Sequence, residues 1–236
     1  MARTPVWKSI VSTLEGEIAS GHYSPGDKLP TEAEYAARFG VNRHTVRRAL
    51  SDMADRGILR SRRGAGVFVE SPPADYPIGR RVRFHQNIAA TGRLPEKKVL
   101  RVETRPCDEI EAAALALAPG DAVVVYEGLS LAGGAPMAHF ESIFPAARLP
   151  GMAATLAETS SVTEALGRNG IADYVRAETR LTAERASPTQ ALHLRLREGD
   201  PLLKSVSLNV GPDGAPVERG ITWFAGDRIT LTVTPD

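Results

Sequence analysis

Hydrophobic side chains in residues 1–70 recur three or four positions apart, which is the spacing of one face of a helix. The spacing predicts a helix over residues 7–20, a second over 32–39, and a third that starts after Asn42 and stops before Gly57. Alternating polar and apolar residues then predict two short strands, at 58–61 and 67–69, joined by a basic turn. The apolar positions of the first and third helices are Ile10, Val11, Leu14, Ile18, Val46, Ala49, Leu50 and Met53.

The boundaries of the second and third helices carry recognisable signals. Thr31 and Glu34 have the spacing of a capping box, in which each side chain binds the other residue's backbone amide. Gly40 is suited to the left-handed conformation that ends many helices, and Asn42 is a good N-cap for the third helix. Helix, short turn, helix and strand pair together predict a winged helix-turn-helix.

Basic residues concentrate around this motif. Residues 1–72 contain 11 Lys/Arg against 8 Asp/Glu, whereas the remaining chain contains 18 against 20. Between residues 40 and 66 only Asp52 and Asp55 oppose the arginines. A solvated basic face is the alternative interpretation, but basic residues on both the third helix and the predicted hairpin tip favour contact with DNA.

Residues 29–69, LPTEAEYAARFGVNRHTVRRALSDMADRGILRSRRGAGVFV, resemble the DNA-binding domain of GntR-type transcription regulators. The shared features are the Pro25-Gly26 turn, the Thr31-Glu32 helix start, the helix opened by Asn42 and a Gly64-x-Gly66 wing. Ala33 departs from the pattern, since many relatives have an arginine there. The resemblance, together with nearby basic residues, implies a DNA-binding set of Lys28, Thr31, Asn42, Arg43, His44, Thr45, Arg47, Arg48, Arg62, Arg63, Gly64 and Gly66.

Beyond a proline-containing linker at residues 71–83, the pattern changes to α+β, so we expect domains at 1–70 and 84–236. In the second domain we expect helices over 86–91 and 108–117, and strands over 97–105, 122–131 and 136–144. The segment from Leu115 to Pro136 recurs from Leu194 to Pro216, including a Gly-Asp turn and a Gly-Ala-Pro hairpin. Such a duplication predicts one antiparallel sheet with pseudo-two-fold symmetry, helices on one face, and a ligand cleft between the halves.

Residues 84–236 resemble, more loosely, the effector-binding (UTRA) domain of the HutC subfamily, whose fold is that of chorismate lyase. Several short sequence motifs resemble those of the PhnF-type branch, which controls phosphonate uptake and breakdown. Among them are Asp75-Tyr76-Pro77 and Arg83-Phe84-x-Gln86-Asn87. The fold class expected for the whole chain is therefore α+β, a winged helix-turn-helix followed by a chorismate-lyase-like sheet domain.

The resemblance also implies where an anionic effector would bind. Ser161 and Glu164 form a second capping-box pattern, at a place where relatives hold a phosphate group, although a plain helix cap is equally consistent. His85 stands where relatives carry a hydroxyl residue, and Glu218 where they hold a ligand's polar or amino group. Trp223 could line the pocket or belong to the core. The full candidate effector set is Arg83, His85, Ser130, Glu141, Ser161, Thr163, Glu218, Trp223 and Arg228.

Other function classes receive less support. The single Cys107 excludes an intrachain disulfide, and the five dispersed histidines show no metal-ligand spacing, so we expect neither metal nor cofactor. No apolar run is long enough for a bilayer, which favours a cytoplasmic protein without membrane contact. No catalytic constellation supports a chorismate-lyase-like enzyme, and an architectural DNA-binding protein would not need the duplicated domain.

We therefore expect a ligand-responsive transcriptional regulator that acts as a repressor. It would bind a palindromic operator in double-stranded DNA as a homodimer and be released or retuned by a small anionic effector. Genes for phosphonate or phosphate uptake or breakdown are the first expectation. Amino-sugar phosphate or amino-acid catabolism is the alternative pathway.

Overall fold

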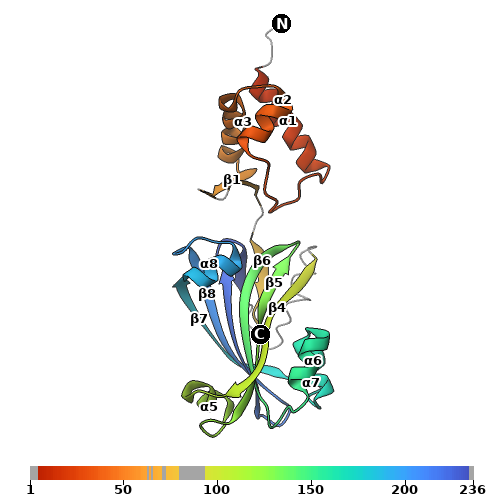
Figure 1. Ribbon diagram of the computed structural model, residues 1–236, viewed down its shortest axis with the longest axis vertical. Coiled ribbons are helices and arrows are strands. Elements are labelled where there is room, and N and C mark those ends of the chain that lie inside the picture. Colours follow the sequence, from red (N-terminus) through yellow and green to blue (C-terminus); the bar gives the residue numbers. More distant parts are fainter. Residues whose placement is uncertain (1–4, 63, 65, 71–72, 80–93, 234–236) are drawn as a thin grey trace. The chain divides into compact units, whose positions relative to one another are not determined.

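The computed structural model describes residues 5–62, 64, 66–70, 73–79 and 94–233 (Figure 1). The chain divides into two compact units, residues Met1–Pro72 and Pro73–Asp236. The expected helix at 86–91 and the candidate residues Arg83 and His85 lie outside the described residues.

The first unit is the predicted winged helix-turn-helix. Its elements are α1 (Val6–Ala19), α2 (Glu32–Phe39), α3 (Arg43–Asp55), β1 (Leu59–Arg62) and β2 (Gly66–Val69), with β1 and β2 antiparallel. The predicted apolar faces of α1 and α3 meet in one core, in which Leu14, Val46 and Met53 are fully buried.

The predicted helix boundaries of this unit are confirmed. Thr31 and Glu34 form a complete capping box at the start of α2, and Gly40 ends that helix with φ of 64°. The Asn42 side chain accepts a hydrogen bond from the Thr45 amide at 2.8 Å and so caps α3. These local contacts set the length of the turn between the two helices.

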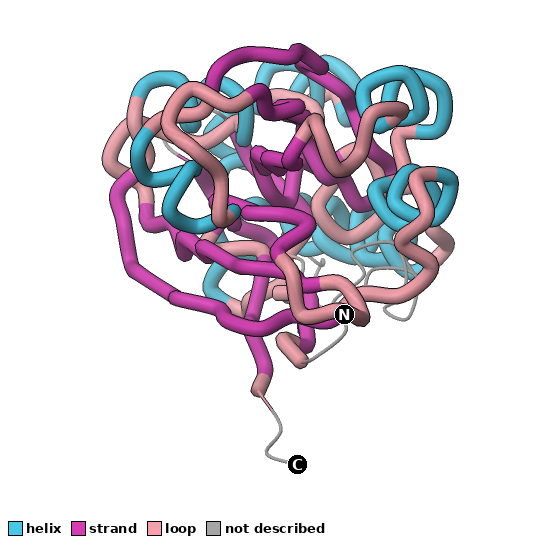
Figure 2. Tube along the Cα trace, turned by 90° about the horizontal axis from the view of Figure 1, so that it is seen from below, coloured by secondary structure: helices cyan, strands magenta, loops and turns pink. Residues whose placement is uncertain are grey.

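The second unit is built on a six-stranded antiparallel sheet in the order β4-β5-β6-β9-β8-β7. Strands are its main regular structure, drawn in magenta in Figure 2, and its helices are short. The elements are β4 (Pro95–Pro106), α5 (Glu109–Leu115), β5 (Ala122–Ala132), β6 (Ala135–Pro145), α6 (Met152–Thr159), α7 (Val162–Arg168), β7 (Val175–Arg185), α8 (Pro188–Leu194), β8 (Pro201–Val210) and β9 (Pro216–Ala225).

The predicted duplication is visible in the strand order, since β4-β5-β6 and β7-β8-β9 meet at the centre of the sheet through β6 and β9. Each half carries a helix that leaves one sheet edge and a hairpin that follows it. The helices cross the dyad: α5 of the first half contacts β9, and α8 of the second half contacts β6. Each half therefore covers part of the other half's strands.

The expectation of helices on one face is wrong. The two repeated helices, α5 and α8, share one face, but α6 and α7 pack on the other, beside β4 and β5 (Figure 1). The reason is the connection between the halves: Leu149, Met152, Leu156 and Leu166 are fully buried, and their apolar side chains need the opposite sheet face as a partner.

The predicted linker is also partly structured. Residues Ala74–Pro77 form β3, which pairs in parallel with β10 (Ile229–Thr232) in the second unit. Ala74, Tyr76 and Ile229 are buried in a small cluster with Phe224. Burial of these apolar side chains favours order over an extended linker, so residues 73–79 belong to the second unit.

Candidate functional site

The exposed face of α3 carries the basic residues predicted to touch DNA. Val46, Leu50 and Met53 occupy the core, so the intervening side chains must point outward. Arg43 and His44 are exposed, and neither makes a hydrogen bond or ion pair with the residues that the structure describes. Their donors are available to an external acceptor such as a phosphate oxygen or a base edge.

Arg47 is paired within the unit. Its guanidinium donates to both carboxylate oxygens of Glu32, at 2.8 and 2.6 Å, from the first turn of α2. The pairing lowers the pKa of the Glu32 carboxyl below its usual value. The Arg47 side chain is still 60% exposed, so Glu32 orients the guanidinium without covering it.

Acids from outside the basic stretch neutralise part of its charge. Arg38 pairs with Glu17 of α1, and Arg56 pairs with Glu15 of α1 as well as with Asp52. In the sequence around α3 the only acidic residues are Asp52 and Asp55. The acidic residues of α1 lie far away in the sequence, and tertiary packing brings them next to these arginines. The free basic face is thus smaller than the sequence suggested.

Arg48 and Lys28 both lie against other residues of the first unit. The Arg48 guanidinium lies 4.8 Å from the centre of the Trp7 ring, a cation–π contact that draws it toward α1. The Lys28 side chain crosses the wing at Gly66, where a Cβ atom would approach its Cε within 2.8 Å. Gly66, with φ of 117°, therefore permits a lysine to pass over the wing, in addition to any approach of DNA.

The remaining DNA-binding candidates have structural roles or lie outside the description. Thr31 and Asn42 cap helices, and the Thr45 hydroxyl donates to the Asn42 side chain at 3.0 Å. Gly64 stands in the turn of the wing with φ of 77°. Arg62 ends β1, but its side chain, like the whole of Arg63, is not among the described parts.

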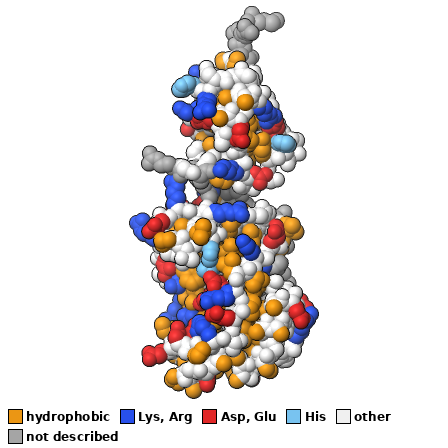
Figure 3. Space-filling model, viewed as in Figure 1, with side chains coloured by type: hydrophobic (Ala, Val, Ile, Leu, Met, Phe, Trp, Pro, Cys, Tyr) orange, Lys and Arg blue, Asp and Glu red, His pale blue; other side chains and the backbone are white. Residues whose placement is uncertain are grey.

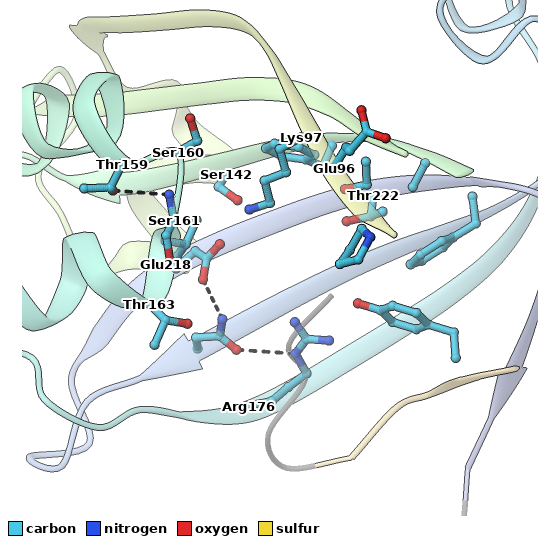
Figure 4. A pocket seen from close by; sticks show the side chains of 18 of the residues that line it. Glu96, Lys97, Ser142, Thr159, Ser160, Ser161, Thr163, Arg176, Glu218 and Thr222 are labelled. Carbon is cyan, nitrogen blue, oxygen red and sulfur yellow. Dashed lines mark hydrogen bonds between the residues drawn. The ribbon is translucent and has the colours of Figure 1, made fainter. Parts of the chain in front are cut away.

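A second candidate site is a pocket of about 650 Å³ on the sheet face covered by α6 and α7 (Figure 4). Strands from both halves form its floor, and the α6–α7 junction forms one wall. Four charged side chains, Glu96, Lys97, Arg176 and Glu218, line it together with a series of hydroxyls. The hydroxyl residues are Tyr76, Ser130, Ser142, Thr159, Ser160, Ser161, Thr163, Tyr174 and Thr222.

The two pocket cations occupy matching positions in the two halves. Lys97 on edge strand β4 is the register partner of Ser130, and Arg176 on edge strand β7 is the register partner of Asn209. Ser130 and Asn209 occupy corresponding positions 79 residues apart. The duplicated sheet thus places one cation at each edge of the same pocket.

Lys97 lies over aromatic rings and is largely shielded from solvent. Its Nζ is 5.1 Å from the centre of the Phe140 ring and 5.6 Å from that of Tyr126. Burial lowers the pKa of the Lys97 ammonium below its ordinary value, and the nearby charge of Glu218 opposes that shift. In Figure 4 the amine extends toward Glu218 and Ser142.

A buried polar chain connects the second cation to the carboxylate. Asn209 donates to Glu218 at 2.6 Å and accepts from Arg176 Nε at 3.3 Å. Asn209 and Glu218 are both buried. Since each polar group has a partner, the chain holds Glu218 and Arg176 at fixed positions along the pocket floor.

The α6–α7 junction supplies hydroxyl groups and one left-handed residue. Ser160 has φ of 55°, and its carbonyl accepts from the buried Tyr126 hydroxyl at 2.9 Å. Ser161 caps α7 by accepting from the Glu164 amide at 3.3 Å. The reciprocal half of the predicted capping box is absent from these described residues, because the Glu164 carboxylate pairs with Arg168 at 2.6 Å.

The pocket contains four of the predicted effector residues, Ser130, Ser161, Thr163 and Glu218. Two others, Glu141 and Trp223, point away from it, because alternate residues of a strand face opposite sides of the sheet. Glu141 lies between the pocket residues Phe140 and Ser142 and faces Arg101 on the other side. Trp223 likewise faces outward and stacks on His139. Both therefore lie outside the pocket lining, contrary to the expectation.

Arg228 also lies outside the pocket lining, for a different reason. Its guanidinium donates to backbone carbonyls of Pro136, Leu194 and Arg195, so it joins α8 to the β5–β6 hairpin. These acceptors satisfy its donors locally.

Sequence reasoning missed Lys97, Arg176 and Asn209. Extending the repeat to the edge strands would have signalled them, since each edge strand contributes one cation beside a polar residue on the next strand.

The opposite sheet face carries an ion-pair network. Arg101 pairs with Glu103, Glu127 and Glu141, and Arg105 pairs with the buried Glu111 of α5 at 2.6 Å. Figure 3 shows acidic and basic side chains interspersed on one face of this unit. Burial raises the pKa of Glu141 above its usual value, with Glu127 contributing. Because the carboxylates of this network outnumber its two arginines, this face is a poor candidate for an anionic ligand.

Comparison with known proteins accounts for both units. Residues 7–69 match the model of the bacterial regulatory proteins of the gntR family, and residues 90–230 match the UTRA domain. The chain belongs to the GntR family of UTRA-domain regulators. GntR regulators bind DNA through the first unit and small effectors through the UTRA domain.

Its relatives are transcription regulators, two of which match over almost their whole length. The GntR/UTRA chain is 34% identical to an uncharacterized HTH-type regulator, RB1450 of Rhizobium meliloti, over 97% of this chain and 94% of the relative. It is 32% identical to the probable transcriptional regulator PhnF of Escherichia coli over 96% and 94%. It is 30% identical to the histidine utilization repressor of Klebsiella aerogenes over 61% and 56%. These similarities confirm the expected GntR/HutC-type regulator.

The fold has solved counterparts. PhnF from Mycobacterium smegmatis superposes with a TM-score of 0.66 at 24% identity, over 98% of this chain and 99% of that one. This likeness confirms the α+β architecture. Among the described residues of this regulator, none forms a helix long and apolar enough to cross a membrane.

Proposed function

We propose that this GntR/UTRA regulator is a non-enzymatic, cytoplasmic homodimeric repressor that binds a palindromic operator through α3 and its wing. Arg43, His44 and Arg47 are the proposed contacts to base edges and phosphates in the major groove. In this arrangement Thr31, Thr45 and the wing glycines would lie next to the sugar-phosphate backbone of the DNA. The exposed guanidinium and imidazole groups of α3 support this assignment.

The proposed effector is a small zwitterion that carries a phosphonate or phosphate group and an amine. A phosphoryl group would accept from Lys97, Arg176 and the hydroxyls of Ser161 and Thr163, and an ammonium group would pair with Glu218. The observation that carries this proposal is the presence of two cations and the buried carboxylate of Glu218 in a single pocket, whose other carboxylate, Glu96, is exposed. The Glu218 carboxylate would repel a purely anionic ligand. An aminoalkyl-phosphonate has an ammonium group to pair with Glu218 and a phosphonate group to pair with the cations.

Similarity to PhnF over the whole chain supports genes of phosphonate or phosphate uptake or breakdown as the target. Release from the operator requires that the effector bind the DNA-competent and released states with different affinity. A tenfold change in operator affinity corresponds to about 1.4 kcal/mol of coupling between the two sites.

The direct test is a calorimetric and DNA-binding panel on the full-length protein. The ligands are aminoethylphosphonate, ethylphosphonate, inorganic phosphate, an amino-sugar phosphate and histidine, with fluorescence anisotropy on the gene's own upstream DNA. We expect the aminophosphonate to bind most tightly and to change operator affinity. If none of the five binds or alters DNA affinity, the effector proposal is wrong. Chorismate serves as the enzymatic control. Turnover of chorismate without specific DNA binding would contradict the proposal that the protein is a regulator.

The DNA contact has its own test in a matched pair of variants. Arg47→Ala should reduce operator affinity by roughly tenfold or more, as expected for loss of a bidentate base contact. Glu32→Gln keeps Arg47 but frees it from its acidic partner, and should preserve or raise affinity. Retained tight, specific binding by Arg47→Ala would show that α3 is not the reading helix.

A further inference from the structure

Two histidines and a glutamate meet on the sheet face opposite the effector pocket. His139 of β6 and Glu127 of β5 lie on neighbouring strands, and His139 Nε2 is 2.8 Å from Glu127 Oε1. His193 of α8 completes the group, with its ring centre 4.9 Å from that of His139. One nitrogen or oxygen atom from each of the three residues lies within 4.8 Å of the others. Although distant in sequence, these residues are therefore not dispersed in the fold.

Each histidine retains an unused buried nitrogen. Nδ1 of His139 and Nδ1 of His193 have no hydrogen-bond partner among the described residues, and His139 is only 6% exposed. A buried imidazole nitrogen without a partner is costly, because it has lost water and gained nothing in return. In this region two such nitrogens occur on adjacent rings. A hydrogen bond between His139 and Glu127 alone does not account for the second ring.

The neighbouring residues hold the cluster in place. The Trp223 ring stacks on His139 at 5.2 Å between centres, which fixes the imidazole plane. Arg101 donates to the other oxygen of Glu127 at 3.0 Å, which orients the carboxylate and leaves Oε1 facing His139. Such outer contacts are typical of ligand groups in metal sites.

We infer that Glu127, His139 and His193 form a binding site for a divalent transition-metal ion of the zinc class. Two imidazole nitrogens and one carboxylate oxygen are ligands that zinc takes in three-ligand sites, where water fills the fourth position. Imidazole disfavours magnesium and calcium, which prefer oxygen ligands. In a tetrahedral site, bond lengths of about 2.0–2.2 Å place the ligand atoms about 3.4 Å from one another, somewhat closer than the 4.8 Å limit within which they lie here. Small side-chain rotations therefore suffice to close the site.

The ion would link α8 to the two strands beneath it. His139 lies between Ala138 and Phe140, whose side chains line the effector pocket on the other face of β6. Glu218 and the pocket hydroxyls take no part in the metal site. Metal binding is therefore separable from effector binding, although both sites use β6.

The test uses full-length protein freed of metal with a chelator and titrated with zinc against a chromophoric competitor. We expect one ion per chain, an increase in melting temperature, and a tetrahedral absorption spectrum when cobalt replaces zinc. His193→Ala removes a partly exposed ligand, and Glu127→Gln keeps the shape of the side chain, so both should fold. Each should weaken zinc binding by at least about tenfold.

Matched controls distinguish this site from adventitious binding. His22→Ala removes a histidine of the first unit, and Glu218→Gln removes a carboxylate of the effector pocket; both should bind zinc as the unaltered protein does. Absence of stoichiometric uptake would overturn the inference and leave a neutral histidine pair beneath α8. So would unchanged affinity in both His193→Ala and Glu127→Gln, or equal loss in the controls.

Discussion

The two halves of the UTRA sheet share small structural details but differ in the chemistry that they direct into the pocket. Capping boxes start both repeated helices, Asp108 with Glu111 and Ser187 with Gln190. Both helices end at a left-handed non-glycine residue, Ala116 in one half and Arg195 in the other. Their φ angles are 54° and 52°.

The turns that follow are equally alike. Asp121 accepts from the Ala118 amide, and Asp200 accepts from the Arg197 amide, each at 2.9 Å. Local backbone geometry has therefore been retained in both copies. The repeated turns fix the start of β5 and β8 in the same way.

The halves diverge on the pocket floor. Each edge strand contributes a cation, Lys97 or Arg176. The next paired positions are Ser130 with Ala138 in the first half but Asn209 with Glu218 in the second. A symmetric backbone thus carries an asymmetric charge pattern: each half contributes a cation, but the buried carboxylate of the floor, Glu218, comes from the second half alone. This difference suits a ligand whose two ends differ, and each prediction below tests it.

The largest effect is expected from removing both cations. Lys97→Ala with Arg176→Ala should reduce phosphonate affinity by on the order of a thousandfold, because each charged hydrogen bond contributes about 1.5–3 kcal/mol. Calorimetry on the single variants then compares the halves directly. Equal losses mean that both edges hold the anion, whereas a loss confined to one variant would assign it to one half. Operator binding without effector is the control.

A smaller effect is expected at the position where the halves differ. Glu218→Gln should weaken an aminoalkyl-phosphonate by roughly tenfold but strengthen a plain alkyl-phosphonate, because a repulsive carboxylate becomes neutral. The ratio of the two dissociation constants measures the contribution of the second half alone. If both ligands lose affinity equally, the carboxylate does not face an ammonium group.

The pH dependence tests the cation of the first half. Burial lowers the pKa of Lys97 in the folded protein, so its charge is present at low pH and disappears as pH rises through that lowered pKa. Phosphonate affinity should therefore decline on the alkaline side earlier than an ordinary lysine would predict. Lys97→Arg should remove the decline, because arginine stays charged. An identical profile for both proteins would mean that Lys97 does not bind the anion.

The repeated turns allow a stability comparison of about 1 kcal/mol. Asp121→Ala and Asp200→Ala each remove one side-chain acceptor from a backbone amide, so each should lower the free energy of unfolding by about 1 kcal/mol. Denaturant titration of the two variants should give similar losses. A much larger loss for one would show that the halves are not energetically equivalent.

The smallest effect concerns the left-handed helix ends. Ala116→Gly should stabilise the protein by up to about 1 kcal/mol, since glycine has no Cβ penalty at φ of 54°. Arg195→Gly should gain less, because Arg195 also donates to the Gly134 carbonyl. Melting temperatures compare the two, and destabilisation by Ala116→Gly would contradict the strain argument.

The sequence by itself determined the elements whose signals are local. Thr31 with Glu34, Gly40 and Asn42 set the helix-turn-helix. The repeated Leu-x-Leu-x-x-Gly-Asp motif, at residues 115–121 and 194–200, revealed the duplication. These features depend on contacts between residues only a few positions apart. For that reason the family, the fold class and the exposed basic helix were predictable.

Only the tertiary structure decided which side chains share a site. Alternation along β6 and β9 turned Glu141 and Trp223 away from the pocket. The register of the edge strands β4 and β7 placed Lys97 and Arg176 in the same pocket as Glu218. Packing of helices also paired Arg47 with Glu32 and brought His193 beside His139. The physical reason is register: a strand's pairing partner fixes the face of every residue, and that partner lies far away in the sequence.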